Sequence, residues 1–265
     1  MFQGGIIQPT SPGVDMNFYR RARFDNGKYG ITSNWMLSPQ VCQTEEIAPV
    51  LLDIFPINDP AYESAGVKAL KHLKTALFKR QLPDDLAADI GNLLGDFDII
   101  AELAFDRVWY GQPPVERIEV RPLVISTPNP DSRVLLGDRT DALGRRRVKL
   151  DWRLTEFDKR SVRRGLEIAA TEVGRLEIGR MKITLNDDDT TWPDDLHGAY
   201  HHLGTTRMHD DPRQGVVDRD CRVYGIDNLY IAGSSVFPTA GTGSPTLMLI
   251  ALALRLADHI KEQLA

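Results

Sequence analysis

Cysteine is scarce in this chain, which has only two, Cys42 and Cys221, among 265 residues. Two cysteines cannot form a disulfide-dense scaffold, and neither has a second cysteine or a histidine at zinc-finger spacing. Long apolar runs are also missing, because no stretch approaches the roughly 20 consecutive apolar residues that a membrane-spanning helix needs. These absences exclude a disulfide framework, a zinc finger and a membrane span.

An excess of positive charge is absent as well. The chain has 32 Lys and Arg against 37 Asp and Glu, for a net charge of −5. Nucleic acids and anionic membranes are bound through concentrated positive charge, so neither is expected as the main partner. The first residues lack the basic region and apolar core of a signal peptide, which makes a cytoplasmic location the default expectation. The chain is long enough for one large domain or two smaller ones.

Periodicity divides the sequence into helical and β-rich parts. Apolar residues recur at helix-face spacing in segments 64–79, 84–104, 158–176 and 245–264. The first sixty residues are irregular, with short β-leaning runs such as 29–36. Alternation between apolar and charged residues predicts strands over 116–127, 133–137 and 147–154, joined by Pro-, Asn-, Asp- and Gly-rich turns. We expect these three strands to form an antiparallel meander with one solvated face.

The last seventy residues join a short apolar run to a long apolar helix through a loop of small residues. Residues 228–233 predict a buried strand, and 245–264 a helix that begins with proline at a permitted early position. In the loop between them, 234–244, backbone N–H groups could approach a ligand closely. The dipole of the following helix favours negative charge there.

Histidines cluster just before this region. Four of the six lie within thirteen residues, namely His197, His201, His202 and His209. His197 and His201 are four apart, but Gly198 stands where a zincin helix carries glutamate, so no metal site is expected. A surface or capping role stays open for each histidine. The following segment, 203–208, predicts a tight turn that places hydroxyls and a guanidinium beside an imidazole, the side chain best suited to accept a proton near neutral pH.

Two other catalytic motifs are incomplete. A nucleophile elbow requires Gly-x-Ser-x-Gly, and none of Ser234, Ser235 and Ser244 has glycines at both positions. The segment 241–243 begins like a dinucleotide-binding fingerprint, but the third glycine is missing and no strand follows to complete a βαβ unit. Neither a serine hydrolase nor a free-standing Rossmann domain is expected.

Several motifs, in one order, resemble the C-terminal part of the glucose-methanol-choline (GMC) oxidoreductases. They are Tyr-His-His-Leu-Gly-Thr-Thr-Arg-Met at 200–208, Gly-Val-Val-Asp at 215–218, Cys-Arg-Val-Tyr-Gly at 221–225, Asn-Leu-Tyr-Ile-Ala-Gly-Ser-Ser-Val-Phe-Pro-Thr at 228–239, and Pro-Thr-Leu-Met at 245–248. The resemblance is strongest over 195–265 and extends more weakly to 129–134 and 148–152.

The resemblance implies an α+β fold. An antiparallel β-sheet with flanking helices would form a substrate-binding region over 1–195, and residues 196–265 would contribute to an FAD site. This second part would supply the final strand and helix of an FAD-binding α/β domain whose N-terminal part is missing, because no Gly-x-Gly-x-x-Gly element occurs in the sequence. A nucleotide-binding half would then be supplied in cis or by another chain. Without it, the last strand would have an unpaired edge and the terminal helix an uncovered apolar face.

The resemblance also implies a chemistry, the oxidation of the CH–OH group of a small alcohol or sugar by hydride transfer to N5 of FAD. His201 stands four residues before the Thr of the Gly-Thr turn and would take the hydroxyl proton. Ser244 stands just before Pro-Thr-Leu, where the family usually has an Asn or His that binds the same hydroxyl. Oxygen, a quinone or a haem partner would reoxidise the flavin.

The same resemblance assigns the residues that would touch the cofactor. Ala232, Gly233 and Ser234 would lie along its phosphate or ribityl portion. Pro245, Thr246 and Leu247 would meet the isoalloxazine ring from the start of the helix. A second interpretation stays open, because the serine at 244 and the missing nucleotide-binding half also fit a non-catalytic remnant or a regulatory subunit of the same fold.

Overall fold

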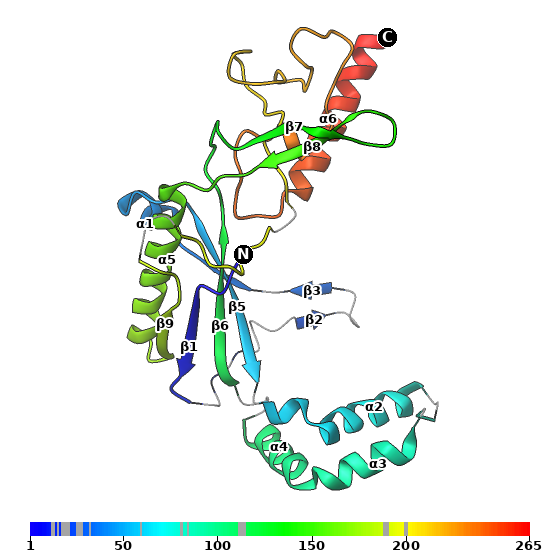
Figure 1. Cartoon of the computed structure of the whole chain (residues 1–265). Helices are drawn as coiled ribbons and strands as arrows, with labels where there is room; N and C mark the ends of the chain where they lie inside the picture. Colours follow the sequence, from blue (N-terminus) through cyan, green and yellow to red (C-terminus); the bar gives the residue numbers. More distant parts are fainter. Residues whose placement is uncertain are drawn as a thin grey trace.

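A central β-sheet lies between a three-helix arm, residues 65–110, and a C-terminal segment, residues 201–265 (Figure 1). The computed structural model describes residues 1–11, 14, 16, 22–24, 29–31, 33–58, 60–79, 82–83, 85–110, 115–187, 191–198 and 201–265. The strands are β1 (Gly5–Pro9), β2 (Ala22–Phe24), β3 (Tyr29–Ile31), β4 (Asn34–Met36), β5 (Val50–Asn58), β6 (Val115–Val124), β7 (Arg133–Thr140), β8 (Arg146–Asp151) and β9 (Gly179–Ile183). The helices are α1 (Pro39–Thr44), α2 (Ala65–Lys79), α3 (Leu86–Gly95), α4 (Phe97–Tyr110), α5 (Glu156–Arg175) and α6 (Thr246–Leu264), with short 3₁₀ turns at Pro60–Glu63 and Ser234–Val236.

Five strands form the central sheet, in the order β4-β5-β6-β1-β9, and every neighbouring pair is antiparallel. The long β5–β6 pair runs from Val50 opposite Val124 to Asn58 opposite Val115. Because side chains alternate along a strand, one face of this pair carries the buried apolar residues. This sheet confirms the expected α+β class with an antiparallel sheet.

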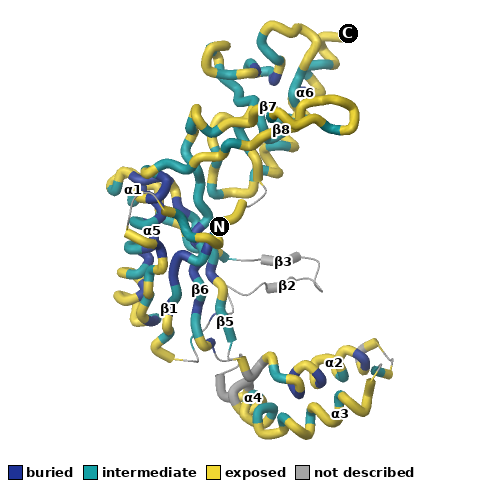
Figure 2. Tube along the Cα trace, in the orientation of Figure 1, coloured by how far each residue is buried: buried dark blue, intermediate teal, exposed yellow. Residues whose placement is uncertain are grey.

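Helix α5 covers the apolar face of the sheet and closes the first hydrophobic core (Figure 2). Val162, Leu166 and Val173 of α5 are buried in this core. Gly165 allows the helix to lie close to the sheet, because a Cβ atom at this position would meet the Val50 side chain at 3.2 Å. The helix predicted over 158–176 is confirmed, with a start two residues earlier.

The start of α5 is held by a buried carboxylate. Thr155 and Asp158 form a reciprocal capping box, in which each side chain accepts from the backbone N–H of the other. The Asp158 carboxylate also accepts from the backbone N–H and the hydroxyl of Thr127, at 2.9 and 3.0 Å. Because Thr127 follows β6, this one side chain joins the sheet to the helix that covers it.

Three sequence predictions need correction. The helix predicted over 84–104 is two helices, α3 and α4, which are separated at Asp96. The Asp96 carboxylate accepts from the Gly66 N–H of α2 at 2.6 Å. Asp84 itself lies outside the described residues.

The predicted meander is also wrong. Among the described strands, β7 and β8 pair only with each other, while β6 pairs with β5 and β1. Both faces of the β7–β8 hairpin are largely exposed, so the alternation at 133–151 does not mark one wet and one buried face.

The third correction concerns the strand predicted over 228–233. This run makes a single bridge, between Arg222 and Tyr230, and forms no strand in the part of the chain that the structure describes. Leu229 and Ala232 are exposed and Ile231 is half-buried. An apolar run becomes a buried strand only when neighbouring strands pair with both of its edges. No described segment provides such a pair of neighbours here.

The carboxylate of Asp158 generates a stability prediction. Replacing Asp158 with Ala removes four accepted hydrogen bonds around a buried helix cap and should lower the free energy of unfolding by about 2–4 kcal/mol. Urea denaturation followed by circular dichroism measures the change. Glu172→Ala is the matched control, since Glu172 is an exposed carboxylate on the same helix and its solvent-screened pair with Arg175 should contribute little to stability. Equal effects of the two variants would contradict the assigned role.

Candidate functional site

The C-terminal segment has a hydrophobic core of its own. Val217, Cys221, Val236 and Leu256 are buried in it, and neither they nor the side chains packed on them belong to the core of the sheet. Loops and one side of α6, rather than strands, form this core, and isolated bridges such as Met208–Val217 connect the loops. Burial raises the pKa of the Cys221 thiol, so this cysteine is held protonated within the core.

Helix α6 packs on this core with one side only. Leu256 is buried, and Leu252 and Ile260, four residues away on either side, pack around it. Arg255 of α6 donates to the Arg219 carbonyl and ties the helix to the loops. The opposite side presents Leu247, Ile250 and Leu254 to solvent, with Leu247 77% exposed. The expected uncovered apolar face on the terminal helix is present.

The histidine-containing segment is paired along its length with the segment after residue 233. Thr206 N–H donates to the Ser235 carbonyl at 2.9 Å, and Met208 N–H to the Val236 carbonyl at 2.8 Å. Side chains extend the pairing, since the Thr206 hydroxyl donates to the Ser235 hydroxyl at 2.7 Å. The Ser234 hydroxyl donates to the His202 carbonyl at 2.9 Å. Two motifs thirty residues apart in sequence thus form one local structure.

This pairing locates two groups of the predicted site residues. His201 and His202 are exposed, and His202 is held to Ser234 through its carbonyl, so His201 lies one residue from an anchored position. Ala232 is exposed, and Gly233 caps the short 3₁₀ turn that starts at Ser234. The structure therefore brings His201 and Ser234 into one neighbourhood.

The other two histidines of the cluster have local structural partners. The His197 ring contacts the Asp195 carbonyl at 2.9 Å, and its backbone pairs with Met1. The His209 ring accepts from the Asp211 N–H at 2.9 Å. The pKa of Asp211 lies below its ordinary value, mainly because the Arg213 side chain hydrogen-bonds to its carboxylate. For His197 and His209 the structure therefore fits the local capping role.

The remaining predicted site residues lie at the start of α6. Ser244 is exposed, and its hydroxyl lies 3.4 Å from that of Thr246. Pro245 occupies the N-cap position of α6, and no capping side chain accepts a hydrogen bond from the first N–H groups of this helix. Leu247 points its apolar side chain into solvent. Within the described residues, no hydrogen bond joins this group to His201 or to Ala232–Ser234.

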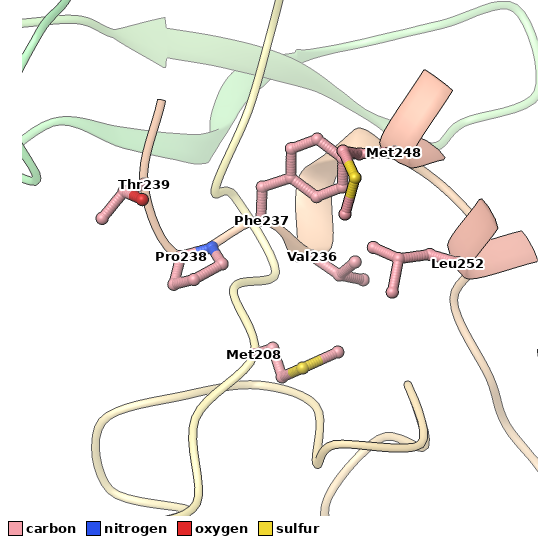
Figure 3. A pocket seen from close by; sticks show the side chains of 7 residues that line it. All are labelled: Met208, Val236, Phe237, Pro238, Thr239, Met248 and Leu252. Carbon is pink, nitrogen blue, oxygen red and sulfur yellow. The ribbon is translucent and has the colours of Figure 1, made fainter. Parts of the chain in front are cut away.

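An apolar pocket lies beside these segments, and none of the predicted site residues is among its lining residues. It has a volume of about 290 Å³ and lies between the loop at 236–239 and the first turns of α6 (Figure 3). Its lining comes from three segments, with Met208 from the first, Val236, Phe237, Pro238 and Thr239 from the second, and Met248 and Leu252 from α6. Sequence reasoning assigned no role to these side chains. Phe237, Pro238 and Met248 all lie within the quoted motifs, which was the available signal.

Comparison with known proteins identifies the region. Residues 128–253, just under half of the chain, match the family described as GMC oxidoreductase. This part of the chain therefore matches the C-terminal region of the GMC oxidoreductases.

Individual relatives agree with this assignment. A C-glycoside 3-oxidase from Microbacterium trichothecenolyticum is 32% identical over 136 residues, which is 50% of this chain and 25% of the relative. The large subunit of a fructose dehydrogenase from Gluconobacter japonicus is 30% identical over 52% of this chain and 24% of its own length. An oxygen-dependent choline dehydrogenase from Sinorhizobium fredii is 37% identical over 32% of this chain and 16% of its own. The matches thus span a quarter or less of each of these relatives.

Among solved structures, pyridoxine 4-oxidase from Mesorbium loti aligns with 98% of this chain and 42% of its own, at 17% identity and a TM-score of 0.46. Formate oxidase from Aspergillus oryzae aligns with 58% of this chain and 29% of its own, at 21% identity and a TM-score of 0.38. None of the described helices is both long and apolar enough to cross a membrane.

The left-handed turn at Gly204, inside the histidine-containing segment, generates a second prediction. Gly204 has φ +77°, and a Cβ there would lie 3.3 Å from the Phe237 carbonyl oxygen. Gly225 has φ +78° with nothing within 4 Å. Both Gly→Ala variants should cost about 1–2 kcal/mol for the left-handed backbone, but only Gly204→Ala should also loosen the pairing. Amide hydrogen exchange measures this. Protection of Thr206 and Met208 should fall in Gly204→Ala alone, and equal protection in both variants would contradict the prediction.

Proposed function

We propose that this chain is the C-terminal part of an FAD-dependent oxidoreductase that acts on the CH–OH group of alcohols or sugars. The observation that carries the proposal is the pairing of His202–Met208 with Ser234–Val236, which holds the histidine turn against the Gly-Ser turn. The named activities of the relatives, on a C-glycoside, on fructose and on choline, support a hydroxyl-bearing substrate. The choice among such substrates is left to experiment.

The residues at the start of α6 suit FAD in two respects. No side chain occupies the N-terminus of the helix, so its first N–H groups are available to a negatively charged group. The loop before it is also uncrowded, because a Cβ added at Gly241 or Gly243 would meet nothing within 4 Å. A flat aromatic ring could approach this backbone closely. When bound, FAD would supply the hydride acceptor.

Within this proposal, the chain's own residues bind and orient the alcohol and hold its proton. His201 would accept the hydroxyl proton at an imidazole nitrogen, since alkoxide character must develop as hydride leaves. Ser244 would make a second hydrogen bond to the same hydroxyl. Ala232, Gly233 and Ser234 would contact the cofactor near its phosphate or ribityl portion, and Pro245, Thr246 and Leu247 near its ring. Oxygen, a quinone or a haem would accept the electrons.

We further propose that 1–195 and 196–265 are separate units, and that a nucleotide-binding half, in cis or in another chain, completes the second. Two hydrophobic cores that share no side chain support the division. The exposed apolar face of α6 and the unformed strand at 228–233 support the missing partner, because both features would be satisfied by one additional parallel sheet.

A second candidate is a non-catalytic subunit or remnant of this fold. The observation that favours it is Ser244, whose short side chain reaches only Thr246 among the described residues, at 3.4 Å. Measuring turnover in a reconstituted complex separates the two candidates. A complex that binds FAD tightly yet reduces no dye with any sugar or alcohol would favour the non-catalytic candidate.

FAD binding provides the first test of the proposed function. The isolated chain should leave FAD fluorescence unchanged, whereas the chain assembled with a nucleotide-binding half should quench it at one FAD per complex. Leu254→Glu on the exposed face of α6 should weaken assembly at least tenfold, because a charge then enters an apolar contact. Leu143→Glu, at the equally exposed tip of the β7–β8 hairpin, is the control. Stoichiometric binding by the isolated chain would overturn the need for a second half.

Catalysis provides the next test. In the assembled complex, His201→Ala should slow flavin reduction by roughly 10²–10⁴-fold, because the developing alkoxide loses its base. His202→Ala should change the rate little, since the anchoring contact of His202 is made by its backbone. Stopped-flow flavin absorbance with a substrate alcohol measures both. An unchanged rate in His201→Ala would show that another group takes the proton.

A further inference from the structure

The stretch of chain that leads from the sheet to the histidine turn is docked on the sheet. We call residues 191–198 the strap. The Trp192 ring meets the buried Phe2 ring edge-on, at 77° and with centroids 5.9 Å apart, and both Trp192 and Leu196 pack on the core of the sheet. Connections between domains are usually exposed and make few contacts. A connection that packs two apolar side chains on one unit is instead held in one position relative to that unit.

Hydrogen bonds to the first residues of the chain also hold the strap. The Asp195 carboxylate accepts from the Gln3 N–H at 2.8 Å, and the His197 N–H donates to the Met1 carbonyl at 3.0 Å. Gln3 is in turn held at the end of β9, since the Thr184 hydroxyl donates to its carbonyl at 2.5 Å. The strap is therefore fixed to residues that are themselves fixed to the sheet.

The position of the histidine turn relative to the sheet depends on this strap. Among the described residues, every hydrogen bond made by 201–265 stays within that segment. The two hydrophobic cores share no side chain either. The last hydrogen bond between the strap and the sheet unit, at His197, lies four residues before His201 in the sequence. Within the described chain, the sheet can therefore hold His201 in place through the strap.

We infer that the strap is a positioning element, and that Trp192 and Asp195 are positioning residues that act through it on His201. The inference rests on the proposed function, in which residues 1–195 bind the alcohol and His201 takes its proton. Proton transfer needs the two groups within hydrogen-bond reach, and a displacement of about 1 Å can cost roughly 100-fold in rate. A base carried by one unit and a substrate bound by the other therefore need a fixed connection.

Three variants form a matched set. Trp192→Ala/Asp195→Ala removes the ring contact and the acceptor for the Gln3 N–H. Trp192→Phe/Asp195→Asn keeps an aromatic ring and an oxygen that can accept the same hydrogen bond. Asp194→Ala is the control, because Asp194 is an equally exposed carboxylate of the strap that makes no hydrogen bond or ion pair with another described residue.

A distance measurement on the full chain tests the placement without FAD. Spin labels at Thr171→Cys on α5 and Glu262→Cys on α6 report the separation of the two units, since both positions are exposed and the native cysteines are buried. The double alanine variant should broaden the distance distribution at least twofold, whereas the conservative double variant and Asp194→Ala should keep the original width. Equal widths in the double alanine variant and Asp194→Ala would overturn the inference.

An intact fold is checked by far-ultraviolet circular dichroism. If the double alanine variant does not fold, Asp195→Ala replaces it, because this carboxylate is exposed and its removal leaves the core unchanged. The single variant should broaden the distribution in the same direction, and Asp195→Asn should restore the width. A width that Asp195→Ala leaves unchanged would then count against the inference.

Flavin reduction in the assembled complex tests the effect on His201. The double alanine variant should lower the limiting rate constant at least tenfold and change the half-saturating alcohol concentration less than twofold, and the conservative double variant should restore the rate. A first-order rate constant does not depend on the folded fraction, so a loss of stability alone would not lower it. A broadened distribution with an unchanged rate would overturn the positioning role. If no form of the complex reduces flavin, the proposed function fails, while the distances still decide whether the strap places the histidine turn.

Discussion

An apolar face must be buried against another element, and this constraint organises the whole molecule. The central sheet satisfies it within the chain, because α5 covers the side on which Val50, Leu52 and Ile54 alternate. In the C-terminal segment, one apolar side of α6 is buried and the opposite apolar side is exposed to solvent. In the arm, α3 has no buried residue. The degree of burial therefore falls from the sheet toward both ends, and the exposed face of α6 is where we place the nucleotide-binding half.

The elements that the sequence predicted well are those whose signal is local. α5 and α6 follow from helical periodicity with clear starts, and β6 from strict alternation. β1 and β9 were not predicted, because five residues such as Gly5–Pro9 carry little pattern and become strands only by pairing with distant segments. β5 was missed for a related reason. Its nine residues include Asp53 and Pro56, and only the neighbours β4 and β6 define them as a strand.

The strand predicted at 228–233 shows the opposite error. Its apolar run carries the local signal of a buried strand, yet the described chain gives it one bridge. Local β-propensity favours a strand at 228–233, but a strand forms only where neighbouring segments pair with it. The same difference between local sequence signal and long-range pairing applies to the site. The resemblance predicted His201 and Ser234 as site residues, but their proximity depends on hydrogen bonds across thirty residues that no periodicity encodes. The pocket lined by Met208, Phe237 and Met248 could be found only in three dimensions.

The backbone hydrogen bonds near His201 hold the histidine turn by contacts made within the C-terminal segment itself. Each bond from Thr206 and Met208 is made to a backbone carbonyl within the same segment, and Val217 and Val236 bury the apolar side of that contact. Nothing in this arrangement needs a cofactor or a second chain to exist. The start of α6 differs, since its N–H groups and Leu247 have no partner in the described chain. A ligand and a partner would therefore add to a preformed histidine turn and order the helix start around it, which is why the turn, rather than the helix, is the structural basis of the proposed chemistry.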